Sequence, residues 1–141
     1  MHRTAEIELK HVIYISRPTH FDHLVLEDIL TKSRSNNPAI GVTGNLIYHA
    51  DLFLQLLEGP PLAVHKLYQT ILADNRHADI VNLRDETFSR RLFASWAMRD
   101  DPVKTWMWTR DEVSKGILND LGSEDAMNIF TRHAKEVDQF L

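Results

Sequence analysis

The sequence predicts an α+β fold, in which a sheet of mostly antiparallel strands carries two helices on one face. Short β-branched and aromatic runs alternate with helix-spaced apolar stripes in the order β-α-β-β-α-β. Only His49, Ala50 and Asp51 separate the second strand from the third, as in a hairpin. The 141 residues, 43% hydrophobic and 26% charged, suit one soluble globular domain. This order of elements predicts a ferredoxin-like sandwich with one added strand.

The first strand is predicted over Leu9–Ser16, a β-branched and aromatic run. Alternation places on one of its faces Val12, Tyr14 and Ser16. Taken alone, Tyr14 fits a half-buried strand tyrosine with its hydroxyl at the edge. A helix follows over Thr19–Asn36, capped by Thr19 and stopped by the run Asn36-Asn37-Pro38. Its apolar stripe contains Phe21, Leu24, Leu26, Ile29 and Leu30.

The second and third strands are predicted over Ile40–Tyr48 and Leu52–Leu57. Gly41 and Gly44 indicate close backbone approach or a bulge. In the third strand, Gln55 shares a face with Phe53 and Leu57, while Leu52, Leu54 and Leu56 share the other. A buried glutamine amide is costly unless it is hydrogen-bonded, so Gln55 is either a satisfied core residue or part of a polar site.

The second half of the chain completes the sheet and its covers. A helix begins after Gly59-Pro60-Pro61, with a buried face of Leu62, Val64, Leu67, Tyr68, Ile71 and Leu72. An imperfect fourth strand covers Ile80–Leu83 and Glu86–Phe88, and a fifth strand or edge segment covers Arg91–Met98. Two further helices, Thr109–Leu121 and Ser123–Phe140, are expected to cover the other sheet face or to mediate self-association.

Composition excludes several classes of protein. The 16 basic and 20 acidic residues give a net charge of −4, with no basic stripe for nucleic acid. The absence of cysteine excludes disulfides and thiolate chemistry. The first ten residues lack the apolar core of a signal peptide, and no apolar run could span a membrane, so we expect a cytoplasmic protein. His20 and His23 have a metal-compatible spacing without a third ligand, and we expect them to be solvated.

Five separated motifs resemble those of BLUF domains, the sensors of blue light using FAD. In chain order they are IYIS, SRSNNPAIGVTGNLIY, FLQLLEGP, Arg76-His77 after an Asp, and RLFASWAM. The resemblance covers about residues 9–98, and the C-terminal helices resemble those of short single-domain BLUF proteins more loosely. It implies a flavin-binding photosensor domain over residues 1–100, with a helical extension over 101–141 in the same compact unit.

The resemblance also implies a set of site residues. Asn37 and Asn36 match contacts to the pyrimidine edge of the flavin ring, and Tyr14 and Gln55 match the photochemical pair. Other cofactor-binding matches are Ile29, Ser33, Asp74, Arg76 and His77, and signal-relay matches are Trp96 and Met98. Thr70 replaces a basic residue of some members, so Arg76 is the better candidate for the phosphate end and Asp74 for sugar or backbone. Asparagine and glutamine amides offer both donors and acceptors, which suits the mixed edge of a flavin.

These residues predict a blue-light photoreceptor, not an enzyme. The expected cofactor is FAD, with FMN as the alternative, and no metal is expected. The expected partners are a separate downstream effector protein and a second copy of the chain, without nucleic acid or membrane. The alternative function is that of a small ferredoxin-like enzyme or ligand-binding protein without photochemistry, since this fold hosts many functions. Against an enzyme, the sequence shows no nucleophile–base arrangement, phosphate loop or metal cluster.

Overall fold

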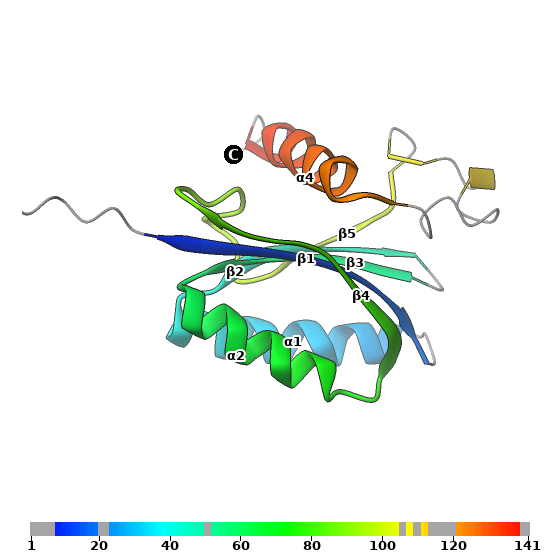
Figure 1. The fold of residues 1–141 in the computed structure, drawn as a ribbon. Helices are drawn as coiled ribbons and strands as arrows, with labels where there is room; N and C mark the ends of the chain where they lie inside the picture. Colours follow the sequence, from blue (N-terminus) through cyan, green and yellow to red (C-terminus); the bar gives the residue numbers. More distant parts are fainter. Residues whose placement is uncertain are drawn as a thin grey trace, which may run out of the picture.

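The computed structural model of this protein describes residues 8–19, 23–49, 52–104, 107–108, 111–112 and 121–138. In that part of the chain, a five-stranded sheet lies between two helical layers, with α1 and α2 on one face and α4 on the other (Figure 1). The elements are β1 Leu9–Pro18, α1 His23–Ile40, β2 Thr43–His49, β3 Leu52–Gly59, α2 Pro61–Leu72, β4 His77–Phe88, β5 Arg99–Pro102 and α4 Ser123–Asp138.

The sheet has the strand order β4-β1-β3-β2-β5, so the two central strands are β1 and β3. Neighbouring strands run antiparallel except β2 and β5, which run parallel. Alternation along β3 sends Phe53 and Leu57 toward α1 and α2, and Leu54 and Leu56 into the cluster with α4. The predicted α+β ferredoxin-like fold and the two-faced third strand are therefore confirmed.

Helix α1 is described from His23. Residues 20–22, over which the predicted helix would begin after its Thr19 cap, lie outside the described residues. The Thr19 hydroxyl is engaged elsewhere, donating to the backbone carbonyl of Arg76 at 3.1 Å, so Thr19 holds the start of β4. Leu24, predicted in the buried stripe, is 76% exposed, whereas Leu26 and Leu30 are buried. Helical spacing alone placed Leu24 wrongly, because the sheet meets only part of the apolar stripe.

The end of α1 also differs from the prediction. Pro38 lies inside the last turn, and the helix continues to Ile40. Gly41 ends it with a left-handed φ of 73°. The amides of Gly41 and Val42 then donate to the carbonyls of Pro38 at 3.3 Å and Asn37 at 3.0 Å, which is a Schellman motif. A proline in the last turn costs few helical bonds, so glycine decides where this helix stops.

Helix α2 and strand β4 agree with the prediction in position but differ in detail. Val64 is fully buried, whereas Leu62 and Leu72, predicted in the same buried face, are 64% and 44% exposed. β4 is a strand of 12 residues that begins at His77, three residues before the predicted imperfect strand, and continues through the predicted interruption at Arg84 and Asp85. It pairs with β1 over nearly its whole length despite two register shifts, and this pairing keeps its polar residues in a strand.

The sequence predicted a fifth strand or an edge segment over Arg91–Met98, and the strand alternative is wrong. That segment has no strand structure, and β5 is Arg99–Pro102. A side chain satisfies backbone donors of this segment, because the buried carboxylate of Glu58 accepts from the amides of Leu92 at 2.8 Å and Phe93 at 2.7 Å. Glu58 of β3 thus holds residues 91–98 on the sheet, although these residues do not form the regular backbone hydrogen bonds of a strand.

The second helical layer is formed by α4. Its buried stripe packs on the sheet through Met127, Phe130, Ala134 and Val137. The predicted helix Ser123–Phe140 is confirmed over Ser123–Asp138. Most of the predicted helix Thr109–Leu121 lies outside the described residues, as does His20 and the side chain of His23.

The described ranges contain neither a membrane-spanning helix nor a metal-binding cluster. None of the helices there is long and apolar enough to cross a membrane. The same part of the chain has no group of three His, Asp or Glu side chains placed to hold a metal ion.

Candidate functional site

A cavity lies between α1, α2 and the sheet face that carries Tyr14 and Gln55. Its volume of about 180 Å³ is more than ten times the roughly 10–15 Å³ that one water requires, so it can hold a larger organic group. All nine residues predicted to bind a cofactor line it: Tyr14, Ile29, Ser33, Asn36, Asn37, Gln55, Asp74, Arg76 and His77. The fold therefore brings together residues that are up to 63 positions apart in sequence, from Tyr14 to His77.

Tyr14, Gln55 and Met98 form a buried chain of polar contacts at this cavity. Tyr14 and Gln55 are directly opposite each other on β1 and β3, and the Tyr14 hydroxyl donates to Gln55 Oε1. Gln55 Nε2 donates in turn to the Met98 Sδ at 3.3 Å. A thioether sulfur only accepts, so the amide must present its NH₂ group to Met98 and its oxygen to Tyr14.

Tyr14 is neutral in this environment. Burial, above all, raises the pKa of its phenol, and the nearby Tyr68 and Asp74 raise it further. The ring lies 5.6 Å from that of Tyr68 and 6.3 Å from that of His77. Tyr14 therefore keeps its proton, and it can donate a hydrogen bond to Gln55 throughout the physiological pH range.

Helix α1 holds the segment that carries Met98. Asn37 Nδ2 donates to the carbonyl of Ala97 at 2.9 Å, and Arg34 Nε donates to the carbonyl of Met98 at 3.0 Å. Arg34 also pairs with Asp100 at 2.7 Å, although both side chains are partly exposed. Asn37 is buried and lines the cavity, so one side chain contacts both the cavity and the segment before β5.

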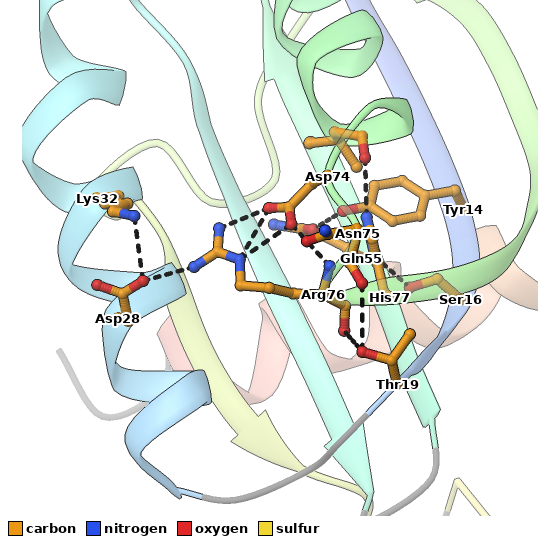
Figure 2. A network of polar contacts seen from close by, with 11 residues as sticks. Tyr14, Ser16, Thr19, Asp28, Lys32, Gln55, Asp74, Asn75, Arg76 and His77 are labelled. Atoms are coloured by element: carbon orange, nitrogen blue, oxygen red, sulfur yellow. Dashed lines mark hydrogen bonds and ion pairs between the residues drawn. The ribbon is translucent and has the colours of Figure 1, made fainter.

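Arg76 lies at the cavity wall between two carboxylates (Figure 2). Its Nε and Nη2 donate to Asp74 at 2.6–3.0 Å, and its Nη1 pairs with Asp28 at 2.6 Å. The hydrogen bond from Arg76 is the main reason that the pKa of the Asp74 carboxyl is lowered. Lys32 extends the network to Asp28 at 3.2 Å. The two cations are thus balanced by two carboxylates, and this reduces the attraction of Arg76 for a phosphate.

His77 joins the wall at the start of β4. Its Nε2 lies 2.9 Å from the carbonyl of Ile71, and its Nδ1 lies 2.9 Å from the hydroxyl of Ser16 (Figure 2). A carbonyl only accepts, so Nε2 carries a proton. Both ring nitrogens are therefore engaged within the protein, and the ring of His77 can offer the cavity only its faces and edges.

Comparison with known proteins agrees with this geometry. The family model for BLUF, "Sensors of blue-light using FAD", matches residues 9–99, well over half of the chain. This chain belongs to the BLUF family. The α+β fold with helices on both faces also matches a solved BLUF protein, BlrB in its dark state, at 30% identity and a TM-score of 0.79. That match covers 94% of this chain and 99% of BlrB.

Two curated relatives support the same family. The "Photoactivated adenylate cyclase subunit beta" of Euglena longa is 34% identical over 97 residues, which is 67% of this chain. The "Blue light- and temperature-regulated antirepressor BluF" of Escherichia coli K12 is 30% identical over 94 residues, also 67% of this chain. The chain spans only 11% of the first relative and 23% of the second. At the level of the BLUF family, the predicted function of a flavin-based blue-light sensor rather than an enzyme is confirmed.

The two predicted relay residues of this BLUF domain lie on opposite sides of the sheet. Met98 is buried in the cluster with α1 and α2, beside Gln55. Trp96 packs against the cluster that includes α4, and the Arg99 guanidinium lies 4.7 Å from its ring centroid. In a strand over residues 91–98, Trp96 and Met98 would share one face, but these residues form no strand.

Seven residues line the cavity that sequence reasoning did not assign to it. They are Lys32, Leu46, Phe53, Leu57, Leu67, Thr70 and Ile71. Phe53 and Leu57 share the strand face of Gln55, and Leu67 and Ile71 belong to the predicted buried stripe of α2, so these four had a signal in the sequence. Lys32 had a weaker one, because it is three residues from Ile29 and four from Asn36 on a helix.

Proposed function

We propose that this chain binds one flavin non-covalently in the cavity and reports blue light through a change in the orientation of the Gln55 amide. The buried contact chain from Tyr14 through Gln55 to Met98 carries this proposal. It connects the cavity wall to the residue that precedes β5, so a change at the amide has a direct structural consequence. The absence of cysteine excludes a flavin–thiol adduct, so the proposed light response uses hydrogen bonds.

The lining residues fit a flavin in chemistry as well as in size. Leu46, Phe53 and Leu57 offer an apolar floor, and Asn36, Asn37 and Gln55 offer amides. A planar ring system with a mixed edge of donors and acceptors needs this combination, because amides match both kinds of group without burying a charge. We assign Asn37 and Gln55 to the polar edge of the ring, and Ile29, Ser33 and His77 to its flanks.

The proposed cofactor is FAD, as the family description states. Arg76 is the cation we assign to the phosphate end, and Lys32 is a second one on the same wall. Asp28 and Asp74 neutralise these cations, so the phosphate contact is expected to be weak. Extraction of the cofactor followed by chromatography distinguishes FAD from FMN.

The mechanism uses the donor and acceptor properties of the chain's own side chains. A bound flavin supplies absorption of blue light and, once excited, an acceptor for an electron and a proton. Tyr14 is the donor we assign, because its buried phenol is neutral and its hydroxyl is hydrogen-bonded to Gln55. Reversal of the Gln55 amide exchanges its two ends with little motion of other atoms.

Reversal of the amide changes what Met98 contacts. Met98 Sδ now accepts from Gln55 Nε2, and after reversal it would face the amide oxygen with no donor between them. The hydrogen bond from Gln55 of β3 to Met98 is then lost. Light is thereby converted into a change at the edge of the sheet.

We further propose that the signal leaves through a separate effector protein. The relatives named for a cyclase and for an antirepressor are proteins several times longer than this chain, which supports output through other polypeptide segments. Rearrangement of a self-associated form is the other output. Capture of an effector protein in dark and light tests the first output. Light scattering of the purified protein tests the second where the rearrangement changes the number of associated copies.

The proposed function is tested by absorption spectroscopy of the purified flavin-loaded protein. Blue light should shift the visible band slightly to the red, and the shift should reverse in the dark. Tyr14→Phe and Gln55→Leu should each retain flavin but abolish the shift. Tyr68→Phe is the matched control, since its ring packs 5.6 Å from Tyr14 but its hydroxyl bonds Asn82 and does not line the cavity. A colourless protein in excess flavin, or a normal shift in Tyr14→Phe, contradicts the proposal.

A further inference from the structure

Asp101 is a buried carboxylate at the junction of three elements. It lies on β5 and is 5% exposed. Its Oδ2 accepts from Asn45 Nδ2 of β2 at 2.9 Å and lies 2.8 Å from His133 Nε2 of α4. Arg99, two residues earlier on β5, donates to both carboxylate oxygens at 2.8 and 3.1 Å. A buried carboxylate is tolerated only where donors surround it, so this arrangement depends on all three partners.

The partner on α4 lies within an otherwise apolar face. His133 is 1% exposed, and Phe130, Ala134 and Val137 of the same helix pack on the sheet around it. Apolar contacts tolerate small sliding motions, whereas a hydrogen bond to a carboxylate has a defined direction and length. Burial disfavours the charge of Asp101, yet the hydrogen bonds from His133 and Arg99 outweigh it and lower the pKa of the carboxyl.

Asp101 is also close in sequence to the proposed light-sensitive contact. Only Arg99 and Asp100 separate it from Met98, whose sulfur accepts from Gln55. β5 is the edge strand of the sheet and pairs only with β2 among the described strands. An edge strand held on one side can shift with the loss of few ladder hydrogen bonds.

We propose that Asp101 and His133 form a latch through which β5 holds α4 on the sheet, and that loss of the Gln55–Met98 contact releases this latch. The inference rests on the proposed function, because light reaches the latch only through Gln55. Asp101 and His133 are positioning residues in this account, since neither lines the cavity. The latch makes α4 the element whose packing reports the state of the cavity.

The test is hydrogen exchange of residues 123–138 in dark and light, with the absorption shift recorded on the same samples. In the wild type, light should speed exchange in this helix. In Asp101→Asn and in His133→Gln, dark exchange should rise by about ten- to a hundredfold, the range expected for a lost hydrogen bond to a charged group. Both variants should keep the red shift and lose the difference between dark and light.

A purely structural role for the pair would raise exchange equally in dark and light and leave the difference intact. The double variant should add little to the effect of Asp101→Asn, because that change already weakens the contact to His133. Glu124→Gln is the matched control on α4, since it breaks only the Arg84 contact of a side chain that is 83% exposed, and it should behave as wild type. Should Asp101→Asn fail to fold, His133→Gln decides alone.

Two results overturn the latch. One is wild-type exchange in residues 123–138 that light does not change, while the red shift is present. The other is a light-dependent difference that persists in His133→Gln. Absence of the red shift in the wild type is a separate outcome, which contradicts the proposed function itself.

Discussion

Replacing Met98 with leucine tests whether the sulfur contact of Gln55 takes part in the light response. Met98 is buried, and its Sδ is 3.3 Å from Gln55 Nε2. Leucine has a similar volume but no acceptor, so packing should change by less than about 1.5 kcal/mol. Flavin binding and the direction of the light-induced shift should be retained, because no group assigned to the flavin is removed.

The magnitude follows from the one contact that is lost. A neutral hydrogen bond contributes about 0.5–1.5 kcal/mol, and a thioether acceptor belongs in the lower part of that range. The dark arrangement has this bond and the reversed amide does not. The preference for the dark arrangement should therefore fall by a factor of about 2 to 5, and dark recovery should slow by up to that factor.

The assay is the decay of the red-shifted absorption after a light pulse. Met127→Leu is the matched control, because Met127 is also buried but packs in the cluster with α4 on the opposite sheet face. Recovery in Met98→Leu at the wild-type rate would refute the reasoning. Equal slowing in both variants would also refute it, since a general loosening of the core would then explain the effect.

Three further predictions follow from individual contacts. Asn37→Ala should weaken flavin affinity by about 1–3 kcal/mol in a titration, because a buried polar partner is removed and the carbonyl of Ala97 loses its donor. Unchanged affinity would show that Asn37 does not bind the flavin. Burial raises the pKa of Tyr14 above its ordinary 10.0, so the native state keeps a proton that the unfolded chain loses above that pH. The red shift should thus be constant from about pH 8 to about pH 10, and the contribution of Tyr14 to stability should fall above pH 10; loss of the shift with a midpoint below pH 10 would argue against the assignment. Gly44→Ala should lower the melting temperature by several degrees, since a Cβ there would lie 2.1 Å from the Leu56 carbonyl oxygen, and overpacking costs about 1–3 kcal/mol; thermal unfolding at the wild-type temperature would show that the strands move apart easily.

Sequence alone determined the features that depend on local periodicity. Alternation along β3 placed Gln55 on the face with Phe53 and Leu57, and alternation along β1 placed Tyr14 with Val12. Because β1 and β3 are adjacent, the two predicted photochemical side chains had to meet once the strands paired. The motif resemblance supplied the rest of the cavity wall, and all nine predicted residues lie there.

Only the tertiary structure decided the course of the chain after β4. Residues 91–98 have the composition of a strand, but the carboxylate of Glu58, more than thirty residues away in sequence, accepts their amide hydrogens. Consequently Met98 and Trp96 lie on opposite sides of the sheet, although they are two residues apart. Tertiary structure also decided two ion pairs. Arg76 pairs with Asp28, which is 48 residues away in sequence. Asp101 contacts His133, which is 32 residues away in sequence. Each of these outcomes depends on a buried or charged group finding its partner through space, and no local pattern encodes which partner that is.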